Sequence, residues 1–144
     1  MTNIENLLPH SGAIVLIDEI LDVDEKSIRV KTTIKKSPFL QNDRFYSYQL
    51  IEVMAQSLGL YRAHNDKKNT TKIAFLIGCR KFEIYKPYLN LGDEIEINSE
   101  LSFQDENGFG VYDSAILLNG NIIAKASLSV LNPSYEMFEE LKNE

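Results

Sequence analysis

Apolar and polar positions are patterned most clearly between residues 45 and 63. Helix formers predominate there, and apolar side chains occupy nearly every side of a 3.6-residue repeat. This pattern predicts a helix over residues 47–63 that is buried all round, with Ser47 as its N-cap. The few polar residues fall within one stripe about 60° wide, and they are Gln49, Glu52 and Gln56. A carboxylate on an apolar helix is expected either to have a hydrogen-bonding partner or to take part in catalysis. The sequence pattern does not distinguish these two roles for Glu52.

The rest of the chain alternates between apolar and polar residues, which is typical of strands with one wet face. Strands are predicted at 13–23, 27–34, 72–85, 94–103, 109–118 and 122–131. Connections are predicted at 24–26, 35–44, 64–71, 87–93 and 104–108. Asn119-Gly120 is a strong hairpin signal between the last two strands. The apolar phase slips inside 72–85, which predicts a bulge near Gly78.

Both ends of the chain carry weaker signals. Residues 1–12 predict a helical turn that Pro9 ends, followed by a loop. Residues 134–142 predict a short amphipathic C-terminal helix. Nothing between them resembles a linker, so we expect residues 1–144 to form a single domain.

A helix buried all round and five or six antiparallel strands with apolar faces have few packing solutions. The sheet must wrap around the helix, which makes the fold class α+β. An edge strand left open after wrapping favours pairing with another subunit in a dimer.

Composition excludes several classes of protein. The net charge of −6 argues against nucleic acid as a partner, and no apolar run is long enough to span a membrane. The N-terminus lacks a signal peptide, so a cytoplasmic location is predicted. Two histidines and one cysteine leave little material for a metal site, and no cofactor is implied. The single cysteine, Cys79, is expected to be a small core residue.

Several segments resemble, in the same order, the signatures of the 3-hydroxyacyl-acyl-carrier-protein dehydratases. They are Leu8-Pro9-His10, Leu16-Ile17-Asp18, Ile51-Glu52-Val53-Met54-Ala55-Gln56, Phe75-Leu76-Ile77-Gly78 with Arg80-Lys81-Phe82, and Leu91-Gly92-Asp93. The resemblance covers residues 7–132 and implies the hotdog fold, an antiparallel sheet wrapped around one central helix. Within the family, the chain is most similar to a divergent branch from aryl-polyene lipid biosynthesis clusters.

The resemblance implies a catalytic arrangement. In the family, a loop histidine removes the α-proton of the acyl thioester, and the helix carboxylate of the partner subunit protonates the leaving hydroxyl. Glu52 matches that acid and Gln56 the neighbouring amide. Backbone N–H groups at the helix start, around Ser47 and Tyr48, are expected to polarise the thioester carbonyl. Gly78 is also expected to contact substrate.

The chain departs from the family where the base is expected. Pro38 stands fourteen residues before Glu52, at the usual position of the histidine, and Tyr46-Ser47 replaces the usual Pro-Gly. His10 is the remaining candidate for the base, although the family histidine in this segment is regarded as structural. The alternative is a loop histidine that binds backbone. His64 and Asp18 are interpreted as structural, His64 through the helix dipole and Asp18 through pairing.

Four functions remain open from the sequence. The first is dehydration of 3-hydroxyacyl chains on acyl carrier protein, with Glu52 as acid and His10 as base. The second is an acyl thioesterase in which Glu52 activates water. The third is a non-catalytic partner of another hotdog dehydratase, in a homodimer or heterodimer, and the fourth is an acyl-binding regulator.

An acidic carrier protein needs a local basic patch on this acidic chain. The expected docking residues are Arg80, Lys81 and Lys86, with further candidates at Lys35, Lys36 and Arg44. An apolar tunnel for the acyl chain is expected beside the helix, lined by Met54, Leu58, Phe75 and Phe82, unless these side chains simply fill the core.

Overall fold

The structure is a computed structural model that describes residues 16–65 and 75–131. Its helical elements are a short 3-10 helix η2 (Ser47–Gln49) and the helix α2 (Leu50–Asn65). The strands are β1 (Glu19–Val23), β2 (Ser27–Thr33), β3 (Arg44–Tyr46), β4 (Phe75–Ile84), β5 (Tyr88–Asn90), β6 (Glu94–Gln104), β7 (Phe109–Leu118) and β8 (Asn121–Leu131). The helices predicted at 1–12 and 134–142 lie outside the described residues.

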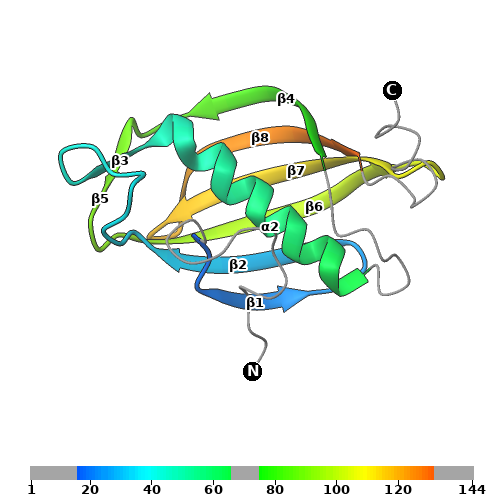
Figure 1. Cartoon of the computed structure of the whole chain (residues 1–144), viewed down its shortest axis with the longest axis horizontal. Coiled ribbons are helices and arrows are strands. Elements are labelled where there is room, and N and C mark those ends of the chain that lie inside the picture. Colours follow the sequence, from blue (N-terminus) through cyan, green and yellow to red (C-terminus); the bar gives the residue numbers. More distant parts are fainter. Residues whose placement is uncertain (1–15, 66–74, 132–144) are drawn as a thin grey trace.

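One antiparallel sheet carries the fold. Its strand order is β1-β2-β6-β7-β8-β4, and β3 and β5 form a separate two-stranded sheet. Helix α2 lies across one face of the large sheet, which curves around it (Figure 1). This is the predicted architecture, and the number of strands in the large sheet agrees with the prediction.

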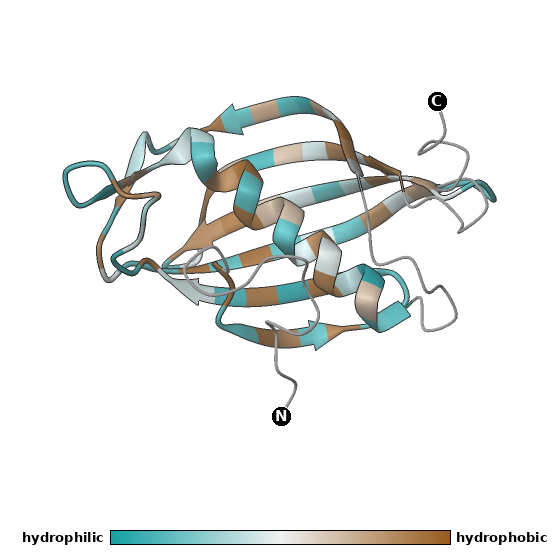
Figure 2. Cartoon of the chain, in the orientation of Figure 1, coloured by the Kyte–Doolittle hydropathy of each residue, from teal (hydrophilic) through white to brown (hydrophobic). Residues whose placement is uncertain are grey.

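Apolar and polar residues alternate along the strands (Figure 2). Because this alternation matches the burial pattern, the sheet has an apolar inner face and a more polar outer face. Inner-face side chains of β2, β6, β7 and β8 pack against the buried face of α2. The most deeply buried of them are Ile28, Val30, Ile95, Ile97, Ile116 and Leu128 from the sheet and Leu50, Val53, Met54 and Leu60 from the helix. Burial of these apolar groups is the main favourable contribution to folding.

The central helix differs from its prediction in two respects. It continues to Asn65, and its first three residues form the 3-10 helix. It is also not buried all round, because Glu52, Ala55, Gly59 and Ala63 form a half-buried face that points away from the sheet. These positions recur every three or four residues, so they share one side of the helix.

Strand β4 contains the predicted bulge. Its register against β8 shifts between Leu76 and Gly78, and a second shift occurs between Arg80 and Glu83. Lys81 lies in this second irregularity with a left-handed φ of 54°. The whole of β4 is an edge strand of the large sheet.

The remaining boundaries differ for reasons of tertiary structure. Strand β1 begins at Glu19, and residues 16–18 are irregular, whereas a strand was expected from residue 13. The segments 35–44 and 87–93 were expected to be connections, but their ends contribute β3 and β5, which pair with one another. Across the described part of the chain, no helix is long and apolar enough to cross a bilayer.

Candidate functional site

Glu52 and Gln56 lie one turn apart on α2, as predicted. Glu52 is half-buried on the face that points away from the sheet, whereas Gln56 is 3% exposed. The Gln56 side-chain Nε2 donates to Glu52 Oε1 at 3.4 Å. The carboxyl group is therefore neither fully solvated nor isolated.

The chain segment that follows His10 is anchored at this same turn of the helix. The backbone N–H of Leu16 donates to Gln56 Oε1 at 2.8 Å, and the Thr32 hydroxyl donates to the Leu16 carbonyl. Both peptide groups of Leu16 are thus held between α2 and β2. His10 itself lies outside the described residues.

The helix start differs from the prediction at Ser47. This residue is fully buried, its N–H donates to the Pro87 carbonyl at 2.9 Å, and its hydroxyl donates to the Lys86 carbonyl. It therefore does not cap the helix, and its N–H is not the unpaired donor that an oxyanion contact requires. The reason is that the segment after β4 packs directly against the helix start. Tyr48, the other expected residue, is 57% exposed.

A cluster of aromatic side chains surrounds the helix start. The Tyr46 ring centroid lies 6.4 Å from that of Tyr48 and 6.0 Å from that of Tyr88. The Arg44 guanidinium lies 4.3 Å from the centre of the Tyr88 ring, a cation–π contact. We did not predict this cluster, because β3 and β5 bring its members together from segments that were expected to be connections.

The expected docking residues lie on β4 and just after it. Arg80 and Lys81 are exposed on β4, whereas Lys86 is half-buried beside Ser47 at the helix start. Two further candidates already have partners, since Lys35 pairs with Asp18 and Arg44 stacks on Tyr88.

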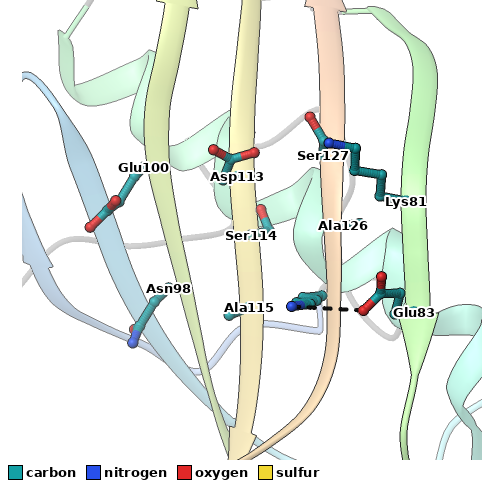
Figure 3. A pocket seen from close by; sticks show the side chains of 10 residues that line it. Lys81, Glu83, Asn98, Glu100, Asp113, Ser114, Ala115, Ala126 and Ser127 are labelled. Atoms are coloured by element: carbon teal, nitrogen blue, oxygen red, sulfur yellow. Dashed lines mark ion pairs between the residues drawn. The ribbon is translucent and has the colours of Figure 1, made fainter.

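Lys81 lines a pocket of about 450 Å³ on the outer face of the sheet. In Figure 3 the helix lies behind the strands, so this pocket is on the opposite side of the sheet from α2. Charged side chains surround it, and the Lys125 ammonium lies 3.7 Å from the Glu83 carboxylate. Other lining residues are Asn98, Glu100, Asp113, Ser114, Ala115, Ala126 and Ser127. Glu52 is not among its lining residues.

Three other residues that the sequence analysis discussed are Cys79, Asp18 and His64, and all three are described by the structure. Cys79 is exposed on the edge strand, so the prediction of a core residue was wrong. β4 is the outermost strand on its side of the large sheet, which leaves Cys79 exposed, and the burial that it retains raises the pKa of its thiol. Asp18 accepts the Thr33 N–H at 2.8 Å in addition to pairing with Lys35, as its structural interpretation predicted. His64 lies in the last turn of α2, where the helix dipole stabilises positively charged side chains.

The expected tunnel residues are only partly described. Met54 and Leu58 are buried in the core, and Phe82 is half-buried against it. Gly78 lies in the first bulge of β4, and a Cβ there would meet the Ser129 side chain at ordinary van der Waals distance, 3.8 Å. Among the described residues, no group of three histidine, cysteine, aspartate or glutamate side chains is placed to hold a metal ion.

A six-stranded antiparallel sheet around one helix, among the residues that the structure describes, defines a hotdog-fold protein. The sequence model of the ApeP-like family, described as ApeP dehydratase, matches residues 2–142. The chain therefore belongs to the ApeP-like dehydratase family, and it is a dehydratase, an enzyme of the lyase class.

Relatives and solved structures agree with this assignment. The 3-hydroxyacyl-acyl-carrier-protein dehydratase FabZ of Streptococcus mutans is 26% identical over 137 residues, which are 90% of this chain and 94% of that protein. The bifunctional enzyme LpxC/FabZ of Chlorobaculum tepidum is 28% identical over 132 residues, which cover 87% of this chain and 28% of that larger protein. The dehydratase heterocomplex ApeI:P from Xenorhabdus doucetiae matches with a TM-score of 0.88 and 24% identity over 100% of this chain and 99% of the matched chain. At that identity the structural likeness establishes the fold.

Proposed function

We propose that the enzyme dehydrates 3-hydroxyacyl chains carried on acyl carrier protein to trans-2-enoyl chains, in fatty-acid-like or aryl-polyene lipid synthesis. The observation that carries this proposal is the half-buried Glu52 carboxyl group, held by the Gln56 amide on the helix face that points away from the sheet. Membership of the ApeP-like family and the FabZ relatives support the reaction class.

In the proposed reaction, a base removes a proton from C2 of the acyl thioester and Glu52 delivers a proton to the C3 hydroxyl. The C3–O bond breaks, a C2–C3 double bond forms, and water leaves. Glu52 then regains a proton from the base, so protons balance over the cycle.

His10 is our candidate for the base. It precedes Leu16 by six residues, and Leu16 is anchored to the helix turn that carries Glu52. An extended segment of six residues spans at most about 20 Å, a length that allows His10 to reach the Glu52 turn of the same subunit. Pro38, at the usual position of the base, has no group that can accept a proton.

The thioester carbonyl needs donors as negative charge develops on its oxygen. We assign this contact to the N–H of Tyr48, since the N–H of Ser47 is bonded to the Pro87 carbonyl. Gly78, in the β4 bulge, is proposed as a second residue that contacts the acyl thioester.

We infer that the edge strand β4 pairs with another hotdog subunit. Four apolar side chains on or next to this strand are more than two-fifths exposed, which is unusual for a monomer: Leu76 at 42%, Ile77 at 54%, Ile84 at 41% and Tyr85 at 56%. The matched Xenorhabdus doucetiae structure is a heterocomplex, which makes a heterodimer as reasonable as a homodimer. We also propose that Arg80, Lys81 and Lys86 bind the carrier protein. The proposed cellular location of the enzyme is the cytoplasm.

The test uses purified protein and 3-hydroxyacyl carrier protein of several chain lengths. We expect mass spectrometry to detect loss of one water from the acyl chain, and Glu52→Gln to lower the rate by about 100-fold or more without loss of folding. His10→Gln should do the same if His10 is the base. Free thiol without an enoyl product would instead select the thioesterase.

A second hotdog subunit of the ApeI type is then added to the same assay. Activity that appears only on mixing, and that Glu52→Gln in this chain leaves unchanged, would identify this chain as a non-catalytic partner. Acyl binding without turnover under either condition would select the regulator.

A further inference from the structure

A two-residue turn fixes the backbone of Arg44 beside the start of α2. Gln41 and Arg44 exchange backbone hydrogen bonds of 2.9 and 3.0 Å across Asn42 and Asp43, which both have left-handed φ values. Such turns match the twist of the strands that they join. Arg44 then begins β3, where its side chain is exposed while that of Phe45 is buried in the core. β3 and β5 lie at the end of the molecule where α2 begins (Figure 1).

The Arg44 side chain is oriented but has no anionic partner among the described residues. Its guanidinium carbon lies 4.3 Å from the centre of the Tyr88 ring. This contact restricts the motion of the guanidinium group, but it gives none of the N–H donors an oxygen acceptor. Within residues 16–65 and 75–131, the ion pairs involve the cations Arg29, Lys31, Lys35 and Lys125. Arg44 thus presents a planar set of donors that suits a phosphate or carboxylate group.

Three tyrosine rings extend from Arg44 toward the N–H that we assign to the thioester. The Tyr88 ring centroid lies 6.0 Å from that of Tyr46, and the Tyr46 centroid lies 6.4 Å from that of Tyr48. Gln41 Nε2 donates to the Tyr48 hydroxyl at 3.3 Å, so the hairpin that carries Arg44 also holds the last ring. The rings therefore form a connected series between the proposed thioester position and the Arg44 cation.

We propose that Arg44 binds the phosphodiester of the prosthetic arm by which an acyl carrier protein holds its substrate, and that the three rings lie along this arm. The acyl chain is a thioester at one end of the arm, and the phosphodiester joins the other end to the carrier. With the thioester at Tyr48, which is 57% exposed, the arm leaves over the solvent side of the helix start. This proposal rests on the proposed function.

The chemistry of the arm matches the order of these side chains. Its middle is uncharged and contains methylene, amide and hydroxyl groups, which suit the apolar ring and polar hydroxyl of tyrosine. Its far end carries the negative charge, and the guanidinium group of Arg44 stands at that end of the series. This contact differs from docking through β4, because it involves the arm and not the protein surface of the carrier.

The kinetic test compares 3-hydroxyacyl thioesters of pantetheine, of phosphopantetheine and of carrier protein. We expect Arg44→Met to lower kcat/KM by about 10-fold for the two substrates that contain phosphate, mainly through KM. For the pantetheine thioester, which lacks phosphate, variant and wild type should agree within about twofold. Arg29→Met is the matched control, since Arg29 is an exposed arginine paired with Glu96 on the large sheet, and it should change none of the three values.

Two substitutions of Tyr88 test the orientation of Arg44. Tyr88→Phe keeps the ring and should retain the preference for phosphate, whereas Tyr88→Leu removes the ring and should lose part of it. Equal losses in both variants would show that the ring does not position the cation.

Titration calorimetry with phosphopantetheine, pantetheine and inorganic phosphate provides a readout that needs no turnover. Wild type should bind phosphopantetheine about 10-fold more tightly than pantetheine, and Arg44→Met should remove this difference. Equal affinity of wild type for the two would overturn the proposal, and so would an equal loss for all three thioesters in Arg44→Met. Inorganic phosphate that binds as tightly as phosphopantetheine would show a general anion site and overturn the assignment to the arm. Absence of any dehydration, with or without a second subunit, would overturn the proposed function, while calorimetry would still test Arg44.

Discussion

The hydroxyl oxygens of Ser99 and Ser114 lie 2.6 Å apart between the middles of β6 and β7, where both residues are at most 3% exposed. The chain of hydroxyls continues from Ser99 to Ser57 on α2 at 3.4 Å. Ser57 donates its proton to the Met54 carbonyl at 2.7 Å. Since each hydroxyl has one proton, Ser99 must donate to Ser57, and Ser114 must donate to Ser99. This directed chain ties the helix to the sheet through polar contacts inside an apolar core.

The first prediction concerns this chain. Ser99→Ala removes the acceptor of Ser114 and the donor of Ser57, so it should lower the free energy of unfolding by about 1 to 3 kcal/mol. Ser114→Ala leaves Ser99 its acceptor and should cost less. Urea denaturation measures both, and the double variant should cost less than the sum of the two. Additive losses would show that the hydroxyls are not coupled.

The second prediction concerns alkaline pH. Desolvation by burial, followed by the Tyr61 charge, raises the pKa of Tyr112 from 10.0 to about 12. A raised pKa means that its contribution to stability is complete below pH 10 and is lost as the pH rises toward 12. The loss should approach about 2 to 3 kcal/mol.

Tyr112→Phe is the control for this second prediction, because it cannot ionise and should decline less over the same pH interval. Some decline should remain, since burial also raises the pKa of Tyr61, whose ring centroid lies 5.4 Å from that of Tyr112. An identical pH profile for variant and wild type would contradict the assignment.

The third prediction concerns Gly110. A Cβ at this position would lie 3.0 Å from Cε2 of Tyr112, and the Tyr112 ring is held against Tyr61. Gly110→Ala should therefore destabilise the fold by about 1 to 3 kcal/mol, because the ring must shift inside a packed core. In a Tyr112→Leu background the same substitution should cost much less. Thermal unfolding of the four proteins tests this, and an unchanged cost in that background would refute the steric explanation.

The fourth prediction concerns the edge strand. Ile77→Glu places a charge on the exposed edge and should convert the proposed dimer to monomers at micromolar concentration, as measured by light scattering after size exclusion. Phe103→Glu is the matched control, since Phe103 is equally exposed at 54% but lies on β6, away from β4. A monomeric wild type, or equal effects of the two substitutions, would argue against pairing through β4.

The local pattern of apolar and polar residues predicted most of the secondary structure of this protein. Alternation along residues 94–103, 109–118 and 122–131 predicted β6, β7 and β8 within one residue at each end, and the phase slip predicted the bulge near Gly78. The spacing of Glu52 and Gln56 placed both on one turn of the central helix. These features follow from periodicities of two and 3.6 residues, which neighbouring residues set by themselves.

The tertiary structure determined which groups the side chains of Ser47, Gln56 and Cys79 contact. Ser47 has the chemistry of an N-cap, but its hydroxyl bonds to the carbonyl of Lys86, which lies 39 residues away. Gln56 binds Leu16, and Cys79 is exposed at the sheet edge although an apolar run precedes it in the sequence. Such contacts depend on strand register and on how the sheet wraps the helix. Those are long-range properties, because every buried N–H and C=O must find its partner in the complete fold.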